Sequence, residues 1–200
     1  QREEDQNFKP GERFVPPAKY TGKKVGIHHF SERPKTLNKK CGWEKGSDSR
    51  CYAWKQKGTD RESAEMMIDY QDKVEGNASY RFVLKNGWSR WQLEMNPDYG
   101  NGVADISAFQ TMGFDLKSKD AEAWEKFRVI IQSKNGKSYE SNLAKLGFRA
   151  DGKWHACRID LQEVKKRGVD LTQVSTLFAV AWEGGVRSGQ SYHLDDLYLE

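Results

Sequence analysis

The closing segment, GQSYHLDDLYLE, contains two adjacent carboxylates between leucines: Asp195 and Asp196 follow Leu194 and precede Leu197. Successive side chains of a strand point to opposite faces. Strict alternation therefore places Asp195 on the core face with Leu197 and Leu199, and Asp196 on the other face in solvent. A buried ionised carboxylate is costly unless it is hydrogen-bonded, paired or bound to a metal. We therefore expect backbone N–H groups or a metal ion to hold Asp195.

The two carboxylates do not form a suitable acid/base pair, because a retaining glycosidase needs carboxyl groups ~5 Å apart across one sugar. The sequence also has no GxSxG, P-loop, HExxH or strand-linked GxGxxG motif. Neither the ExDxxE run of laminarinase-type hydrolases nor the strand motifs of alginate-lyase-type jelly rolls occurs. These observations favour a protein that is not an enzyme. A jelly-roll polysaccharide lyase or glycoside hydrolase, and a structural protein-interaction sandwich, remain as alternatives.

Three cysteines bear on the redox chemistry of the chain. Cys41 and Cys51 flank the polar loop GWEKGSDSR, where a disulfide would constrain a loop of a secreted protein; two free thiols are the alternative. Cys157 alternates with Ile159 and is predicted to be a buried free thiol. Zinc binding by these cysteines would require more ligands at closer spacing.

The composition combines low hydrophobicity with many aromatic residues. Hydrophobic residues make up 36% of the chain, charged residues 31% and aromatic residues 12%, including seven Trp. The net charge of +4 weakly favours an anionic partner and does not indicate nucleic acid. No apolar run approaches the roughly 20 residues of a membrane span, and no signal peptide is visible.

Hydrophobic alternation predicts an all-β chain. Residues 1–48 are rich in charge and proline and are expected to form an irregular N-terminal arm, with KVGIHHF as its one strand-like piece. Residues 49–200 contain about nine or ten short strands, and Asn135-Gly136 predicts a hairpin. A short helix is expected around DLQEVKKRGVD. The predicted fold is an antiparallel β-sandwich of jelly-roll type. The strand segments are CYAWK, AEMMIDYQ (or a helical turn), SYRFVLK, SRWQLEM, TMGFDLKS, KFRVIIQS, KSYESNL, KWHACRIDL, STLFAVAWEG and SYHLDDLYLE.

Residues 75–200 resemble a carbohydrate-binding module of the galactose-binding-like jelly-roll group, most closely the family 11 type. The resemblance rests on four segments: EGNASYRFVLK, ADISAFQTMGFDLKS, DGKWHACRIDLQEV and GQSYHLDDLYLE. It implies a polysaccharide or oligosaccharide partner, with an acidic glycan as one option. It also implies a secreted or cell-surface monomer that is part of a larger multidomain protein. Trp154 matches the framework Trp of the family and is expected in the core.

In such modules, sugar rings stack on aromatic side chains while polar side chains bond the hydroxyl groups. Trp182 is the first candidate, because it lies at a strand end beside the loop EGGVRSG. The alternative places it with Phe178 and Val180 in the core, so that Ala179 and Ala181 form the floor of a groove. A plain solvated sheet face is the alternative for the polar residues. The full set of ligand-binding candidates is Trp182, Trp88, Tyr139, Tyr52, Arg128, Gln132, Arg90 and Gln92.

The resemblance also implies a structural calcium ion. Modules of this group use the first Asp of the closing strand as a ligand, which is Asp195 here. Calcium requires several oxygen ligands, and the early acidic partner is expected to be Asp48.

Overall fold

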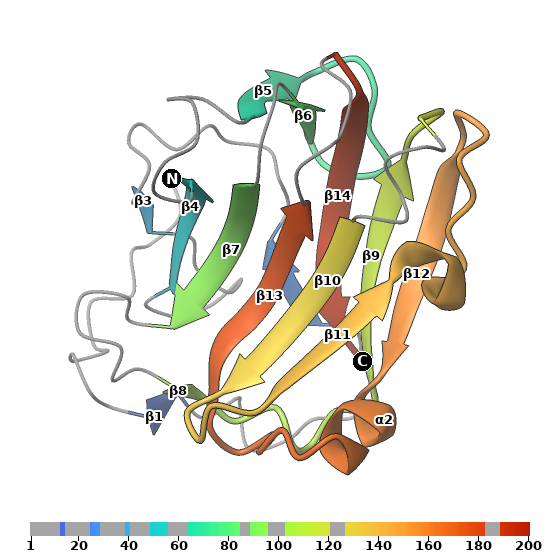
Figure 1. Ribbon diagram of the computed structural model, residues 1–200. Coiled ribbons are helices and arrows are strands. Elements are labelled where there is room, and N and C mark those ends of the chain that lie inside the picture. Colours follow the sequence, from blue (N-terminus) through green and yellow to red (C-terminus); the bar gives the residue numbers. More distant parts are fainter. Residues whose placement is uncertain are drawn as a thin grey trace.

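A computed structural model describes residues 67–84, 103–120, 127–181 and 189–200 with their side chains, and further strand residues by their backbone alone. Fourteen strands lie within the described parts of the chain and form two stacked sheets. The predicted β-sandwich is therefore confirmed. In Figure 1 the larger sheet lies in front of the smaller one.

The larger sheet contains eight strands in the order β1-β8-β13-β7-β4-β3, with β10 pairing to β13 and β11 pairing to β10. All of its pairs are antiparallel except β1 with β8. Its strands are β1 (Arg13–Phe14), β3 (Lys39–Lys40), β4 (Ser49–Lys55), β7 (Ser89–Met95), β8 (Val103–Ala104), β10 (Phe127–Ser133), β11 (Ser138–Asn142) and β13 (Val174–Trp182).

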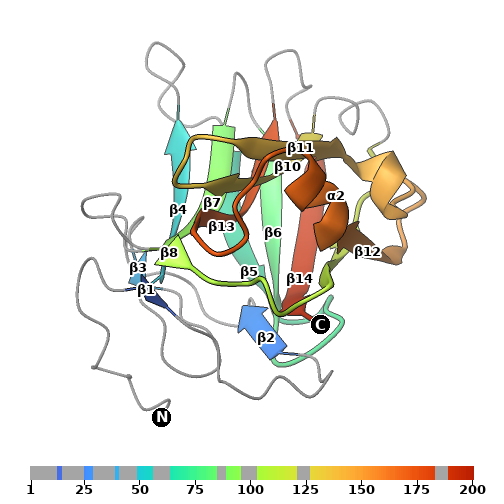
Figure 2. The same ribbon diagram turned by 90° about the horizontal axis from the view of Figure 1, so that it is seen from below.

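The smaller sheet contains six antiparallel strands in the order β12-β9-β14-β6-β5, with β2 pairing to β14. Figure 2 shows β2 beside the end of β14. Its strands are β2 (Val25–His28), β5 (Ala64–Asp69), β6 (Ser79–Leu84), β9 (Thr111–Lys117), β12 (Trp154–Asp160) and β14 (Ser191–Leu199).

The described residues also contain two short helical segments, η1 (Leu143–Leu146) and α2 (Leu161–Lys166). The predicted helix corresponds to α2. Its N-cap is Asp160, whose side chain accepts a hydrogen bond from the Gln162 backbone N–H, and this bond satisfies a donor that the first turn leaves free.

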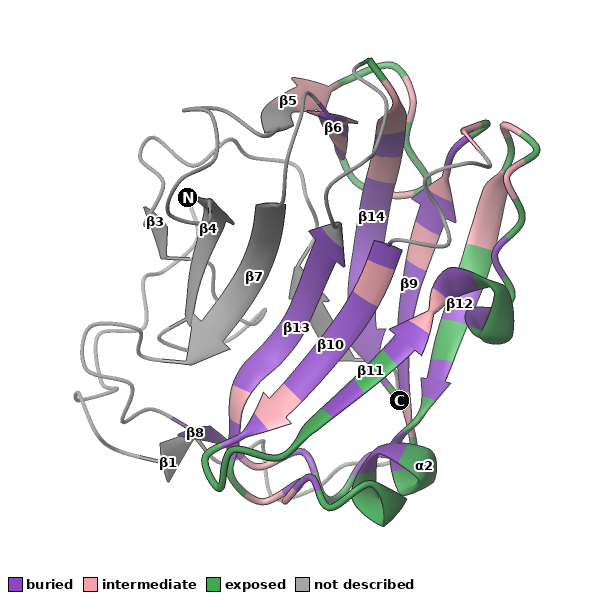
Figure 3. Ribbon diagram, in the orientation of Figure 1, coloured by how far each residue is buried: buried purple, intermediate pink, exposed green. Residues whose placement is uncertain are grey.

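The core lies between the two sheets and is rich in aromatic rings. Phe114 of β9 and Phe178 of β13 meet edge to face with their ring centroids 5.1 Å apart. The ring centroids of Phe127 of β10 and Tyr192 of β14 are 4.7 Å apart. The rings thus join strands of opposite sheets, as expected for face-to-face packing. Figure 3 shows the buried residues concentrated along β13, β10, β9 and β14.

A β-bulge in β14 overturns the expected placement of Asp195. Its register with β9 shifts by one residue between the pairs Asp195–Asp115 and Tyr198–Gly113, and Asp196 has φ of 50°. An extra residue at a bulge reverses the alternation. Leu194 and Leu197 therefore both reach the core.

Asp195 consequently shares the outer face of the smaller sheet with Asp115, and it does not share the core face with Leu197 as strict alternation predicts. Asp196, which was expected in solvent, is buried with 8% of its surface exposed.

Three short strands from residues 1–48 pair with the sandwich. Strand β1 pairs with β8, β2 with β14, and β3 with β4. Together with β8, these three strands explain why the structure has fourteen strands when nine or ten were predicted. The domain boundary between residues 48 and 49 stays a prediction.

Candidate functional site

The register of the larger sheet aligns predicted site residues on its outer face. Since paired residues of antiparallel strands are neighbours on one face, a chain of pairs defines a row across the sheet. One row runs Tyr52–Gln92–Ala179–Ile130–Glu140. It therefore carries two of the predicted residues, Tyr52 and Gln92.

The neighbouring row contains two arginines. It runs Trp54–Arg90–Ala181–Arg128–Asn142. Arg90 and Arg128 thus flank Ala181, one on each adjacent strand. Sequence reasoning did not include Trp54 among the candidates, although it alternates with Tyr52 in β4.

Ile130, Ala179 and Ala181 form a buried apolar cluster separate from the main core. Phe178 and Val180, which alternate with the alanines, lie in the main core. The two alanines therefore lie on the face of β13 opposite Phe178 and Val180, as that alternative expects, and the groove itself stays a prediction. The described polar candidates Arg128 and Gln132 are half-buried, and Arg128 Nη1 donates to the carbonyl oxygen of Phe127 over 3.1 Å.

Tyr139 does not belong to this outer face. It pairs in register with Ile131 and lies in the core with 5% of its surface exposed. The guanidinium of Arg167 lies 4.9 Å from the ring centroid. Little of the ring is therefore open to a sugar, because alternation in β11 turns this position inward.

Trp182 is placed by its backbone at the end of β13. It pairs with Phe127 and Ser89, and the Phe127 side chain lies in the core. Position 182 therefore continues the alternation of Phe178 and Val180, the core-facing positions of β13. Trp88, Asp48 and Cys41 lie outside the described residues, and Cys51 is described by its backbone alone.

On the smaller sheet, Asp195 is fully buried and is held by backbone N–H groups. Its Oδ2 accepts hydrogen bonds from Val74 N at 2.8 Å and Glu75 N at 3.1 Å, and its Oδ1 accepts from Asp196 N at 2.8 Å. Burial raises the pKa of Asp195 to about 6, and the three N–H groups act against that rise.

These N–H groups fit an anion and not a cation, since calcium is held by oxygen ligands. The three N–H groups therefore hold the Asp195 carboxylate without requiring an ion. Calcium binding by the chain, with Asp48 as the second ligand, stays a prediction.

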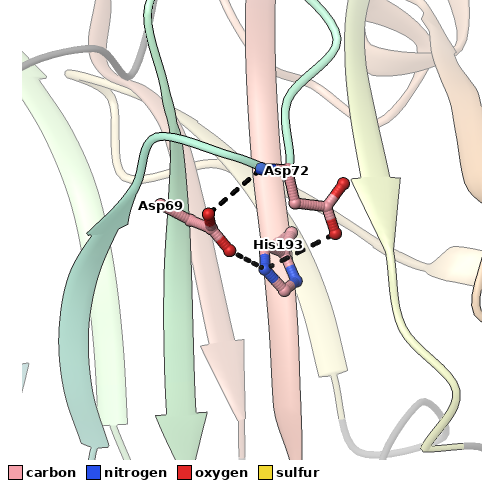
Figure 4. Close-up of side chains that lie close together, drawn as sticks. All are labelled: Asp69, Asp72 and His193. Atoms are coloured by element: carbon pink, nitrogen blue, oxygen red, sulfur yellow. Dashed lines mark hydrogen bonds and ion pairs between the residues drawn. The ribbon is translucent and has the colours of Figure 1, made fainter.

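Sequence reasoning missed a cluster formed by Asp69, Asp72 and His193 (Figure 4). It lies on the same outer face of the smaller sheet as Asp195. His193 Nε2 lies 3.0 Å from Asp69 Oδ2 and 3.9 Å from Asp72 Oδ2. The two aspartates are three residues apart at the end of β5, and His193 alternates with Asp195 in β14. These spacings were the only signal in the sequence, because the two segments meet only in the folded chain.

The pKa values of Asp69 and Asp72 both lie below the ordinary value of a carboxyl group. Burial acts to raise each pKa, but hydrogen bonds outweigh it. For Asp69 these come from the Asp72 and Gln71 backbone and from His193. For Asp72 they come from Lys117 and from Trp154.

Trp154 is half-buried on the outer face of the smaller sheet, where its register partner is Lys117. The resemblance implied a core position, and the structure shows that this expectation was wrong. The indole N–H finds a partner in Asp72, at 2.8 Å from its Oδ1. Cys157 is a buried free thiol as predicted.

A family model described as carbohydrate binding domain 30 matches residues 44–200. No curated protein sequence matches the chain. Among the described residues, no helix is long and apolar enough to cross a membrane.

Three similar solved structures are also carbohydrate-binding modules. One, a family 30 module, has 16% identity and a TM-score of 0.54 over 68% of this chain and 76% of that chain. A family 30 module of the cellulosomal cellulase Cel9D-Cel44B of Clostridium thermocellum has 15% identity and a TM-score of 0.54, over 72% and 88% of the two chains. A family 11 module from the same organism, in complex with a β-1,3-1,4-mixed-linked tetrasaccharide, has 14% identity and a TM-score of 0.49, over 88% and 94%.

Proposed function

The chain belongs to the family of carbohydrate binding domain 30, and from this premise we propose that it binds a glycan chain on the outer face of its larger sheet. A carbohydrate-binding function is what the family implies for the chain as a whole. The proposal adds the location of the site and the residues that form it.

The observation that carries the proposal is the pair of register rows that cross the face. Each row has an alanine at its centre on β13. Ala181 has an arginine on each adjacent strand, whereas Ala179 has Gln92 on one side and Ile130 on the other, and β4 adds an aromatic residue to each row. Five adjacent strands at about 4.8 Å spacing make a surface roughly 19 Å wide. A low apolar floor with polar flanks suits a sugar chain, whose C–H faces contact apolar groups while its hydroxyl groups take hydrogen bonds.

The aromatic and polar positions have different roles. Tyr52 and Trp54 on β4 supply rings for stacking at one edge of the face. Arg90, Gln92, Arg128 and Gln132 supply donors to hydroxyl oxygens. A guanidinium also pairs with a carboxylate in two parallel hydrogen bonds. The proposed ligands of Arg90 and Arg128 therefore include acidic polysaccharides as well as neutral ones.

Affinity electrophoresis in gels that contain single polysaccharides tests the proposal. The panel includes a β-1,4-glucan, since a similar solved module belongs to a cellulase, and one uronic-acid polymer. We expect retardation in at least one gel relative to a non-binding protein of similar size. Folded protein that runs unretarded in every gel would contradict carbohydrate binding.

The same panel distinguishes a binding module from an enzyme. The protein is incubated with each glycan, and reducing ends and unsaturated products are measured over time. A binding module releases neither. Product formation that scales with protein concentration would favour the lyase or hydrolase alternative.

We further expect the module to act outside the cell as a monomer within a larger protein. A polysaccharide ligand is generally extracellular, and the similar family 30 module is part of a cellulosomal cellulase. The domains encoded beside this chain test that expectation: an adjoining glycan-degrading domain would support it.

A further inference from the structure

We propose that Asp69, Asp72 and His193 bind one divalent transition-metal ion, for which zinc is the best fit. The site lies on the outer face of the smaller sheet, whereas the proposed glycan site lies on the larger sheet. The two proposals are therefore independent, and either can fail without the other.

The distances between the candidate ligand atoms suit one ion. His193 Nε2, one oxygen of Asp69 and one of Asp72 all lie within 4.8 Å of one another. Around tetrahedral zinc, with bonds of roughly 2.0 to 2.1 Å, neighbouring ligand atoms are about 3.3 Å apart. The separations of 3.0 and 3.9 Å from His193 Nε2 to the two carboxylate oxygens bracket that value.

Outer hydrogen bonds already orient both carboxylates. Asp69 Oδ1 accepts from the backbone N–H groups of Gln71 at 2.9 Å and Asp72 at 3.0 Å. Asp72 Oδ1 accepts from Trp154 Nε1 at 2.8 Å. In each aspartate these hydrogen bonds hold Oδ1, and Oδ2 is the oxygen that faces His193, as Figure 4 shows. Such supporting bonds position metal ligands and strengthen binding.

His193 projects from the middle of the smaller sheet, so its backbone is fixed on both sides by β6 and β9. Its ring meets the Trp154 ring edge to face, with the centroids 6.0 Å apart. Its side chain is 13% exposed, against 26% for Asp69 and 31% for Asp72. Water can therefore complete the coordination on the open side.

Two cations adjoin the site. Arg81 and Lys117 are the register partners of His193, and Lys117 Nζ bonds the same Asp72 oxygen that faces His193. A metal ion must displace this ammonium. The Lys117 side chain is 27% exposed, so its long stem can carry the ammonium into water.

The ligand types select the class of ion. One imidazole with two carboxylates suits zinc, cobalt or manganese, whereas calcium and magnesium prefer oxygen ligands alone. The site therefore differs in chemistry from the calcium ion predicted at Asp195.

The consequence of binding would be a more stable loop. Asp69 and Asp72 begin the segment whose Val74 and Glu75 N–H groups hold Asp195. An ion that joins both aspartates to β14 ties this loop to the sheet at a second point. Ligands that bind only the folded state raise its stability.

The test is zinc titration of the EDTA-treated and desalted full chain by isothermal calorimetry, followed by melting temperatures with zinc and with magnesium. We expect one zinc ion per chain and a melting temperature raised by zinc but not by magnesium. The variants His193→Gln and Asp72→Asn should each weaken zinc binding by about tenfold or more. Absence of zinc binding would overturn the proposal.

A second His–Asp pair provides the matched control. His155 Nε2 lies 2.7 Å from Asp151 Oδ1, and no third metal-ligating group joins them in the described residues. His155→Gln should leave zinc affinity unchanged. Equal affinity in the wild type and in folded His193→Gln would place the zinc elsewhere, for example at His28 and His29, and would contradict the proposal.

Lys117→Met separates a metal site from a purely structural ion pair. Removal of the competing ammonium should tighten zinc binding several-fold, even if the melting temperature without zinc falls. Unchanged or weaker zinc binding in this variant would contradict the arrangement described here. If His193→Gln does not fold, Asp69→Asn gives the same readout without loss of the imidazole.

Discussion

Asp195 Oδ2 accepts a hydrogen bond of 2.8 Å from the backbone N–H of Val74, which precedes it by 121 residues. This bond joins the last strand of the smaller sheet to the loop between β5 and β6. The same oxygen accepts from Glu75 N, and Oδ1 accepts from Asp196 N inside the bulge. One buried carboxylate therefore fixes both a loop and the local distortion of β14.

Replacement of Asp195 by Ala should lower the free energy of unfolding by roughly 2–4 kcal/mol, because the N–H groups of Val74, Glu75 and Asp196 lose a buried carboxylate as their acceptor. Urea unfolding measures the change. Glu163→Ala is the control, since its ion pair with Lys166 is exposed and contributes little. Equal stability of the two variants would contradict a structural role for Asp195.

Calcium gives a separate readout on the same variants. If Asp195 is a calcium ligand, calcium should raise the melting temperature of the wild type but not that of Asp195→Ala. Equal shifts in both proteins would exclude Asp195 as a ligand and leave the three N–H groups as its partners.

Gly113→Ala should destabilise the fold by about 1–3 kcal/mol or more, as overpacked cores do. A Cβ at this position would overlap the ring of Tyr198, its register partner beside the bulge. The double variant with Tyr198→Ala should recover part of this loss, which a double-mutant cycle of unfolding free energies measures. Additive effects would contradict the close contact.

Arg128→Ala should weaken glycan binding roughly tenfold, the effect of losing one charged hydrogen bond worth about 1.5 kcal/mol. Retardation at several glycan concentrations gives the affinity. Arg158→Ala is the matched control, because Arg158 lies on β12 of the other sheet with its side chain 63% exposed. Equal weakening by both variants would indicate a nonspecific charge effect.

The thiol of Cys157 should not react with iodoacetamide at pH 8 in the folded protein. Burial raises its pKa to about 12, and the charge of Asp115 adds to the rise, so almost no thiolate is present.

The predicted disulfide between Cys41 and Cys51 is tested by adding iodoacetamide to the protein after unfolding without reductant. If the disulfide forms, mass spectrometry should show one labelled cysteine. Labelling of all three would contradict the disulfide.

The local pattern of the sequence determined most of the strands. Phe127, Val129 and Ile131 alternate toward the core as predicted, and the hairpin forms at Asn135-Gly136, where Gly136 has φ of 81°. The predicted short helix also forms, and Asp160 is its N-cap. These features depend on side-chain alternation, turn geometry and capping, all of which act over a few residues.

The tertiary structure alone decided which side chains meet. Alternation predicted the wrong face for Asp195, because a bulge depends on pairing with β9 and leaves no local signal in the sequence. Trp154 lies on the outer face, opposite Cys157 and Ile159 of β12, and only the fold brings Asp72, 82 residues away, to its indole N–H. His193 and Asp69 approach each other across 124 residues for the same kind of reason. Strand order and register are set by the packing of the whole chain, and they determine these contacts.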